Sequence, residues 1–154
     1  MTSKKKKTIT IILSVIAILI AAGAFYGYKE YNRKQKDISD LSAHFTLNSN
    51  VLITDFTKDE KASNLKYLDK VIAVDGILKA IDKDDKGNFT LVIGDTASTS
   101  SVRCSMDSIH NTEATNVKEG SFINVKGVCT GYTADELGLG SDVILNRSCI
   151  IKKQ

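Results

Sequence analysis

Two apolar segments of similar pattern, each interrupted by a glycine, constrain most strongly what this chain can fold into. They read VIAVDGIL at 71–78 and FINVKGVC at 122–129, and both contain a Val-x-Gly core. A glycine inside a strand weakens it and packs no side chain, but it lets the strand coil sharply where a small barrel turns a corner. We therefore expect Gly76 and Gly127 to mark bends in barrel strands.

Five segments after Tyr67 alternate apolar and polar residues with the period of a β-strand. The expected strands are 71–80, 89–93, 101–106, 121–132 and 142–152. A turn-rich connector at 82–88 is typical of an antiparallel hairpin between the first two. The longer connection at 107–119 has room for a short helical turn. Five short antiparallel strands in this arrangement predict a mainly β fold, a five-stranded OB-fold barrel.

The residues before the barrel are expected to form a stalk and one amphipathic helix. Residues 29–48 are mostly polar, which suits a short stalk. Residues 50–64 place apolar side chains in a helical rhythm, with Ser49 or Asn50 as the expected N-cap. The apolar face of this helix is expected to lie across the end of the sheet. Helix and barrel would then form one domain, 49–154.

An uncharged stretch near the N-terminus is long enough to span a membrane. Residues 8–28 contain no charged side chain, and a helix with ~1.5 Å rise per residue then covers a hydrocarbon core of ~30 Å. Residues 1–28 are therefore expected to be a basic N-terminus and a single-pass transmembrane helix that contacts the lipid bilayer. A cleaved signal peptide is the alternative, because Ala22-Gly23-Ala24 fits the small-x-small cleavage pattern.

The charges that flank this stretch balance one another, so they leave its orientation open. Lysines 4–7 precede the stretch, and Lys29, Arg33, Lys34 and Lys36 follow it. A short basic tail followed directly by an apolar stretch is the build of an export signal. We therefore expect the N-terminus inside the cell and the domain on the periplasmic or exterior side of the cytoplasmic (inner) membrane.

The folded part is mildly acidic although the whole chain carries a formal charge of +3. Eight of the 21 basic residues but one of the 18 acidic residues precede Asp37, so the remainder holds 13 basic and 17 acidic residues, a net −4. Proteins that bind phosphate backbones normally show the opposite balance. Phe89, the sole aromatic residue of the second strand, is expected to point into the core with Leu91. A single-stranded nucleic-acid-binding OB domain is therefore kept only as the alternative function.

Three cysteines, Cys104, Cys129 and Cys149, occupy apolar positions of the expected strands. Their simplest role is that of small core residues. Outside the cytoplasm, Cys149 could form a disulfide with Cys129, the preferred partner, or with Cys104. None lies at zinc-ligand spacing, and Lys86 stands where a calcium-binding loop needs an oxygen donor. We expect neither a metal site nor a cofactor.

No pair of residues in the chain suits the roles of nucleophile and base. His44 and His110 are the two histidines, and His110 lies in a connecting segment, where a histidine is usually a solvent-exposed surface residue. The acidic residues of the loops suit turns. We therefore expect no catalytic residue and no enzymatic activity.

Several motifs of the expected barrel occur together in a recognisable order. The most specific are Tyr67-Leu68, Val74-Asp75-Gly76, the turn at Gly120, the KGVCTG run at 126–131, and Cys149. Over roughly residues 37–153 the chain resembles the tRNA_anti-like family of OB-fold proteins. The resemblance implies a helix leading into an OB-fold barrel, a bacterial origin and a membrane-linked place in the cell envelope. It implies no established activity.

The outward face of the second and third strands is the expected binding surface. OB-folds commonly use this face, with the loops that correspond here to 82–88 and 133–141, to bind oligonucleotides or oligosaccharides. The outward side chains are expected to be Thr90, Val92, Arg103 and Ser105. We thus expect a membrane-anchored, extracytoplasmic binding or assembly module for an envelope protein or glycan. An adaptor that uses the helix at 50–64 is the alternative at the same location, and the sequence does not identify the ligand.

Overall fold

The structure, a computed structural model, describes residues 16, 19–29, 31, 36–134 and 140–151. The chain divides into two compact units, Met1–Gln35 and Lys36–Gln154. In the first unit, residues 19–29 are helical. Within the described residues, no helix has both the length and the apolar character needed to cross a bilayer. The expected span at 8–28 lies partly outside the described residues and stays a prediction.

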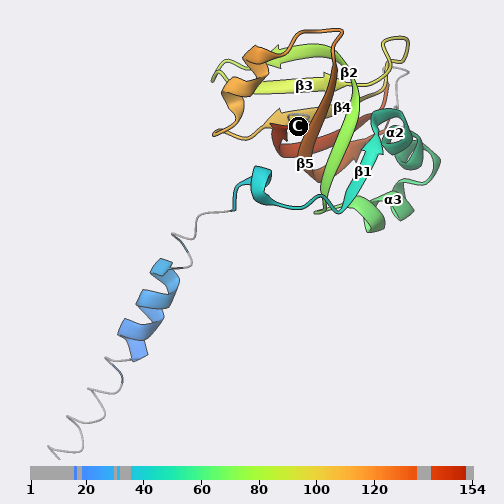
Figure 1. The fold of residues 1–154 in the computed structure, drawn as a ribbon. Coiled ribbons are helices and arrows are strands. Elements are labelled where there is room, and N and C mark those ends of the chain that lie inside the picture. The colour runs from blue at the N-terminus through green and yellow to red at the C-terminus, as the bar shows by residue number, and fades with distance from the viewer. Residues whose placement is uncertain (1–15, 17–18, 30, 32–35, 135–139, 152–154) are drawn as a thin grey trace, which may run out of the picture. The chain divides into compact units, whose positions relative to one another are not determined.

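The second unit is a closed β-barrel (Figure 1). Its strands are β1 (Phe45–Asn48), β2 (Val71–Lys83), β3 (Phe89–Ile93), β4 (Ser101–Met106), β5 (Phe122–Thr133) and β6 (Asp142–Ile150). They follow the order β1-β2-β3-β4-β6-β5, and an additional pairing between β2 and β5 closes the barrel. The mainly β, five-stranded OB-fold barrel is confirmed, with β1 as an extra strand at its side.

Two helices, and not one, precede the barrel. Helix α2 (Ser49–Lys58) and helix α3 (Glu60–Tyr67) are separated at Asp59. The backbone of Asp59 is extended, and its side chain accepts a hydrogen bond from the N–H of Ala62 at 2.9 Å. Asp59 therefore ends the first helix and caps the second. The single helix expected at 50–64 was wrong in this respect.

Helix α2 lies across the end of the barrel, as its amphipathic pattern predicted. Its buried apolar residues are Leu52, Ile53 and Phe56, all in the main core. The ring of Phe56 stacks on that of Tyr132 from β5 at 5.1 Å between centroids. The N-cap is Asn48, one residue before Ser49 and two before Asn50, the two expected caps. Its Oδ1 accepts from the N–H of Asn50 at 3.0 Å.

Strand β2 closes the barrel by changing partners along its length. Residues 71–77 pair with β5, and residues 78–83 pair with β3. Gly76 lies next to this change, where a Cβ would come within 2.5 Å of the Ser49 hydroxyl at the start of α2. Gly127 lies at a register shift between β5 and β6. Both glycines thus stand where a barrel strand departs from regular pairing, and Gly76 also lets α2 approach β2 closely.

Residues 36–48, expected to belong to the stalk, are part of the folded domain. Ile38 in the short 3-10 helix η1 (Ile38–Asp40) is fully buried and shares a cluster with Cys149 of β6. Strand β1 pairs in parallel with residues 72–75 of β2. The domain therefore begins about a dozen residues before its expected start at 49. The polar composition of this segment concealed its role, because few of its side chains are apolar.

The three cysteines are buried free thiols. Cys129 belongs to the main core, whereas Cys149 belongs to the smaller cluster beneath η1. Between Asn146 and Cys149, β6 contains one residue more than the matching stretch of β5. Such a bulge reverses which side chains face the core. The disulfide between Cys129 and Cys149 that the sequence left open does not form in this structure, because the two thiols lie on opposite sides of the sheet.

Candidate functional site

The four residues expected on the binding face come together on β3 and β4. Thr90 lies opposite Ser105, and Val92 lies opposite Arg103. The hydroxyl oxygens of Thr90 and Ser105 are 3.5 Å apart. Alternate residues of both strands point into the core. The two cross-strand pairs therefore form one small outer surface, here called the β3–β4 face.

An ion pair crosses the β3–β4 face. Nη2 of Arg103 lies 2.7 Å from Oδ2 of Asp82 on β2. Because β3 lies between β2 and β4, the arginine side chain must pass over β3 close to Val92. Val92 is only 7% exposed. It is thus shielded and cannot be a main ligand contact, which corrects the sequence expectation, and Asp82 joins the face as a residue that sequence reasoning missed.

The charged side chains beside this face also interact with other groups of the protein. Nζ of Lys79 donates to the carbonyl oxygens of Ser98 at 2.6 Å and Ser100 at 3.2 Å. Burial raises the pKa of Asp142 above its ordinary value, and the charges of Arg103 and Lys79 oppose this only partly. A phosphate backbone would have to compete with these contacts for both cations.

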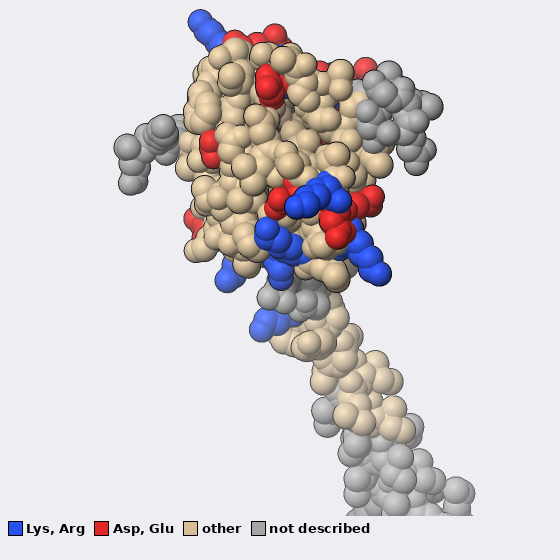
Figure 2. Space-filling model, turned by 90° about the vertical axis from the view of Figure 1, so that its right-hand side faces the viewer, with Lys and Arg blue, Asp and Glu red and all other residues tan. Residues whose placement is uncertain are grey.

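Strand β3 does not present an aromatic surface for stacking. Its aromatic residue, Phe89, packs against the main core, as expected, and Nζ of Lys83 lies 5.2 Å from its ring centroid. Proteins that bind single strands without sequence preference stack bases on aromatic rings. Another side of the domain carries Lys and Arg side chains close to Asp and Glu and is otherwise mostly uncharged (Figure 2). Neither observation favours a nucleic-acid interface.

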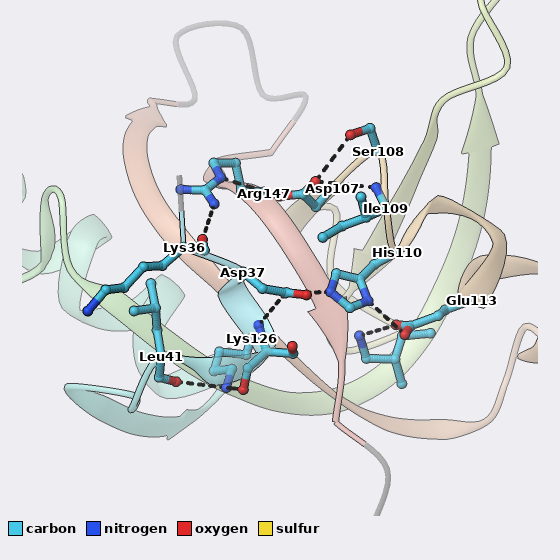
Figure 3. A network of polar contacts seen from close by, with 12 residues as sticks. Lys36, Asp37, Leu41, Asp107, Ser108, Ile109, His110, Glu113, Lys126 and Arg147 are labelled. Carbon is cyan, nitrogen blue, oxygen red and sulfur yellow. Dashed lines mark hydrogen bonds and ion pairs between the residues drawn. The ribbon is translucent and has the colours of Figure 1, made fainter. Parts of the chain in front are cut away.

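A second polar cluster joins the first residues of the domain to the barrel (Figure 3). Nε2 of His110 lies 2.7 Å from Oδ1 of Asp37, and its Nδ1 lies 2.9 Å from Oε1 of Glu113. The other carboxylate oxygen of Glu113 accepts from the N–H of Ile150 at 2.9 Å. We call Asp37, His110 and Glu113 the His110 cluster. His110 is therefore an internal connection and not the solvent-exposed residue that was expected.

Two cations hold the same segment by its backbone. Nη2 of Arg147 donates to the carbonyl oxygen of Lys36 at 2.6 Å. Nζ of Lys126 donates to the carbonyl oxygens of Ser39 and Leu41, both at 2.8 Å (Figure 3). Sequence reasoning missed these contacts, because they join residues about 85 to 111 positions apart and have no local signature.

The His110 cluster shifts the pKa values of its members. Burial alone would lower the pKa of His110, but its hydrogen bonds to Asp37 and Glu113 outweigh burial and raise it above the ordinary value. The hydrogen bond from His110 is in turn the main reason why the pKa of Asp37 is lowered to about 2. The cluster is therefore most stable with a protonated imidazole between two carboxylates.

The His110 cluster predicts that the stability difference between wild type and His110→Gln depends on pH. A raised histidine pKa stabilises the fold fully below ~6.5 and loses this effect as the pH rises through the folded-state value. The lowered pKa of Asp37 stabilises the fold above ~3.8 and loses this effect toward pH 2. Thermal unfolding should show the largest difference in Tm at pH 4–6.5. An equal difference at pH 5.5 and pH 9 would contradict this account.

The described residues offer little for covalent chemistry. Among them, no group of three or more His, Cys, Asp or Glu side chains could hold a metal ion. Burial raises the pKa of Cys129 and of Cys149 to about 11, and that of Cys104 well above its usual range. A thiol with such a pKa stays protonated at neutral pH and is a poor nucleophile.

Comparison with known proteins identifies a family and a fold. The model of the tRNA_anti-like family matches residues 1–150. None of the curated proteins matches significantly. A crystal structure from Klebsiella pneumoniae, named as that of a candidate nucleic acid-binding lipoprotein, aligns with a TM-score of 0.55 at 15% identity. The alignment covers 78% of this chain and 100% of that chain.

Two other solved structures align with this chain at lower similarity. The Stn1–Ten1 complex of S. pombe aligns at 18% identity with a TM-score of 0.36, over 54% of this chain and 59% of that chain. The asparaginyl-tRNA synthetase of Entamoeba histolytica aligns at 12% identity with a TM-score of 0.39, over 56% of this chain and 21% of that chain. At these identities the likeness concerns the fold alone.

Proposed function

Because the chain belongs to the tRNA_anti-like family of OB-fold proteins, we propose that it is a membrane-anchored, non-catalytic binding or assembly module. Residues 8–28 hold it in the bacterial cytoplasmic membrane, with the domain on the periplasmic or exterior side. The uncharged stretch supports this, since it is long enough to span a bilayer. The helix at 19–29 supports it too, because Leu19 and Phe25 are 67% and 71% exposed and would be covered by lipid.

The β3–β4 face is the surface that we propose for binding. The observation that carries the proposal is the pairing of Thr90 with Ser105 beside an arginine that is already neutralised by Asp82. Such a surface offers hydroxyl groups and a balanced ion pair, which suit a partner with neutral polar groups. An envelope protein or a glycan has such groups.

A single-stranded nucleic acid is the alternative ligand. The name of the Klebsiella structure favours it. The net charge of −4 from residue 37 onward argues against it, because phosphate neutralisation supplies most non-specific affinity. The packing of Phe89 against the core also argues against it, because proteins that bind single strands stack bases on exposed aromatic rings.

A specific surface favours an adaptor role for helix α3 as a second candidate function. Leu65 is 83% exposed and Leu68 is 40% exposed. They line a shallow hollow of about 420 Å³ together with Glu60, Lys61 and Asn64. Exposed apolar side chains rimmed by polar groups are typical of protein–protein contacts. An envelope protein would then dock on α3 and not on the β3–β4 face.

The proposal predicts that a photoreactive residue at Thr90 crosslinks an envelope protein or glycan in intact spheroplasts. The full-length chain is used, and protease added from outside is expected to digest the domain while the N-terminal part stays in the membrane fraction. The same photoreactive residue at Lys61 reports on the surface of α3. A crosslink from Thr90 that the Arg103→Ala change abolishes would support the β3–β4 face.

Other outcomes of this experiment decide against the proposal. A crosslink from Lys61 alone would move the contact to α3. Protection from protease until the cells are lysed would place the domain in the cytoplasm. A crosslinked species that is sensitive to nuclease would establish the nucleic-acid alternative.

A further inference from the structure

A hollow on β2, β5 and the end of β6 is lined by none of the residues of the β3–β4 face. Its volume is about 560 Å³, within the range of small-molecule sites. The lining residues are Asp75, Phe122, Ile123, Asn124, Ile150 and Ile151. The hollow thus combines one carboxylate and one amide with apolar walls.

Two neighbouring cross-strand pairs, of which Asp75, Asn124 and Phe122 line the hollow, give this surface a polar and an apolar half. Asp75 lies opposite Asn124, and Ile77 lies opposite Phe122. The pairs are two residues apart along the strands, so their side chains point to the same side at a spacing of ~7 Å. Ile77 is 38% exposed and Phe122 is 58% exposed. A carboxylate and an amide therefore stand directly beside an exposed aromatic ring and an aliphatic side chain.

The amide oxygen of Asn124 has no hydrogen-bond partner among the described residues, although it is buried. Buried polar atoms are nearly always paired, so such an exception needs an explanation. Rotation about χ2 exchanges the two ends of the amide, which can then present either a donor or an acceptor to the hollow. A ligand that both accepts and donates hydrogen bonds would pair with whichever end of the amide faces the hollow.

The carboxylate of Asp75 is held in a fixed position and still has acceptor capacity. Nδ2 of Asn48 donates to its Oδ2 at 3.2 Å. Asn48 is itself fixed, since its Oδ1 accepts from the N–H of Asn50 as the N-cap of α2. A carboxylate offers about four lone-pair sites, so one contact leaves room for hydroxyl donors. The same negative charge disfavours phosphate and carboxylate ligands.

We propose that this hollow binds a sugar unit of an oligosaccharide. The hydroxyl groups of the sugar donate to Asp75 and exchange hydrogen bonds with the amide of Asn124, while one C–H face of the ring packs on Phe122. A pyranose has a hydroxyl edge and an apolar face, which match the polar and the apolar pair of the hollow. This site uses none of the residues of the β3–β4 face. A test of sugar binding here therefore does not depend on whether the β3–β4 face binds a partner.

Calorimetric titration of the full-length chain with two probes, N-acetylated chitotriose and maltotriose, tests this site. The protein is held in a detergent without a sugar headgroup, because a maltoside would compete. At least one probe is expected to bind, and Asn124→Ala and Phe122→Ala are each expected to weaken binding at least fivefold. The matched controls are Asn146→Ala, an exposed asparagine on β6, and Ile109→Ala, an exposed apolar residue in a loop. Neither control should change the affinity.

The melting temperature separates binding from structure. Asn124→Ala removes a buried group that has no partner, so it should leave Tm unchanged or raise it while binding is lost. A fall in Tm together with unchanged sugar affinity would overturn the proposal. So would the absence of binding by both probes up to about 10 mM, a Kd tenfold weaker than 1 mM. Binding of a short extended peptide that Phe122→Ala weakens, with no sugar binding, would assign the hollow to peptides instead.

Discussion

Replacing Phe56 with alanine is expected to lower the free energy of unfolding by about 3–5 kcal/mol, the usual cost of deleting a buried aromatic ring. Phe56 is 1% exposed. Its ring lies 5.1 Å from that of Tyr132 on β5 and 5.8 Å from that of Tyr67 on α3. The substitution would therefore leave a cavity where both helices meet the barrel. Urea unfolding followed by circular dichroism measures the loss.

Val51 provides the control on the same helix. It is 48% exposed, so Val51→Ala should cost no more than about 0.5 kcal/mol. A large difference between the two variants would show that α2 is held by one buried side rather than by helix propensity. Equal costs would mean that α2 is not packed against the barrel end as described.

The strands were predictable from the sequence because each carries its own signal. The segments 89–93 and 101–106 are short strand-forming runs bounded by turn residues, and the observed bounds of β3 and β4 agree with the expected ones. The helix break at Asp59 was not predictable from periodicity, because the apolar rhythm continues across it. The bulge near Cys149 was equally hidden, since one extra residue in β6 reverses the side-chain direction that alternation predicts.

The candidate site was predictable only as a set of positions. Strand parity correctly placed Thr90, Arg103 and Ser105 on one surface. It could not predict that Arg103 reaches Asp82 and covers Val92, because that contact depends on the order of three strands. The contacts of the His110 cluster were even less predictable from the sequence, since Asp37 precedes His110 by 73 residues. Contacts of this kind follow from the closed barrel and not from any local pattern.

A chain that starts at Lys36 is expected to unfold cooperatively, whereas a chain that starts at Ser49 is not expected to reach the native state. The shorter chain lacks Ile38, whose burial alone contributes about 1.5–3 kcal/mol. It also lacks β1, which pairs with residues 72–75 of β2 and brings the ring of Phe45 to 5.1 Å from that of Tyr67. Domains of this size have a net stability of about 5–15 kcal/mol, so these losses together remove most of it.

A third chain, starting at Ala43, separates the two contributions. It keeps β1 but lacks η1, Asp37 and the backbone carbonyls that Lys126 and Arg147 bind. Calorimetry should show an intermediate Tm for this chain, because β1 still covers the edge of β2 while the cluster around Ile38 is open to water. If the chain from Ser49 melts at the same temperature as the chain from Lys36, then residues 36–48 contribute no stability. The segment would then serve only as the stalk that its composition suggested.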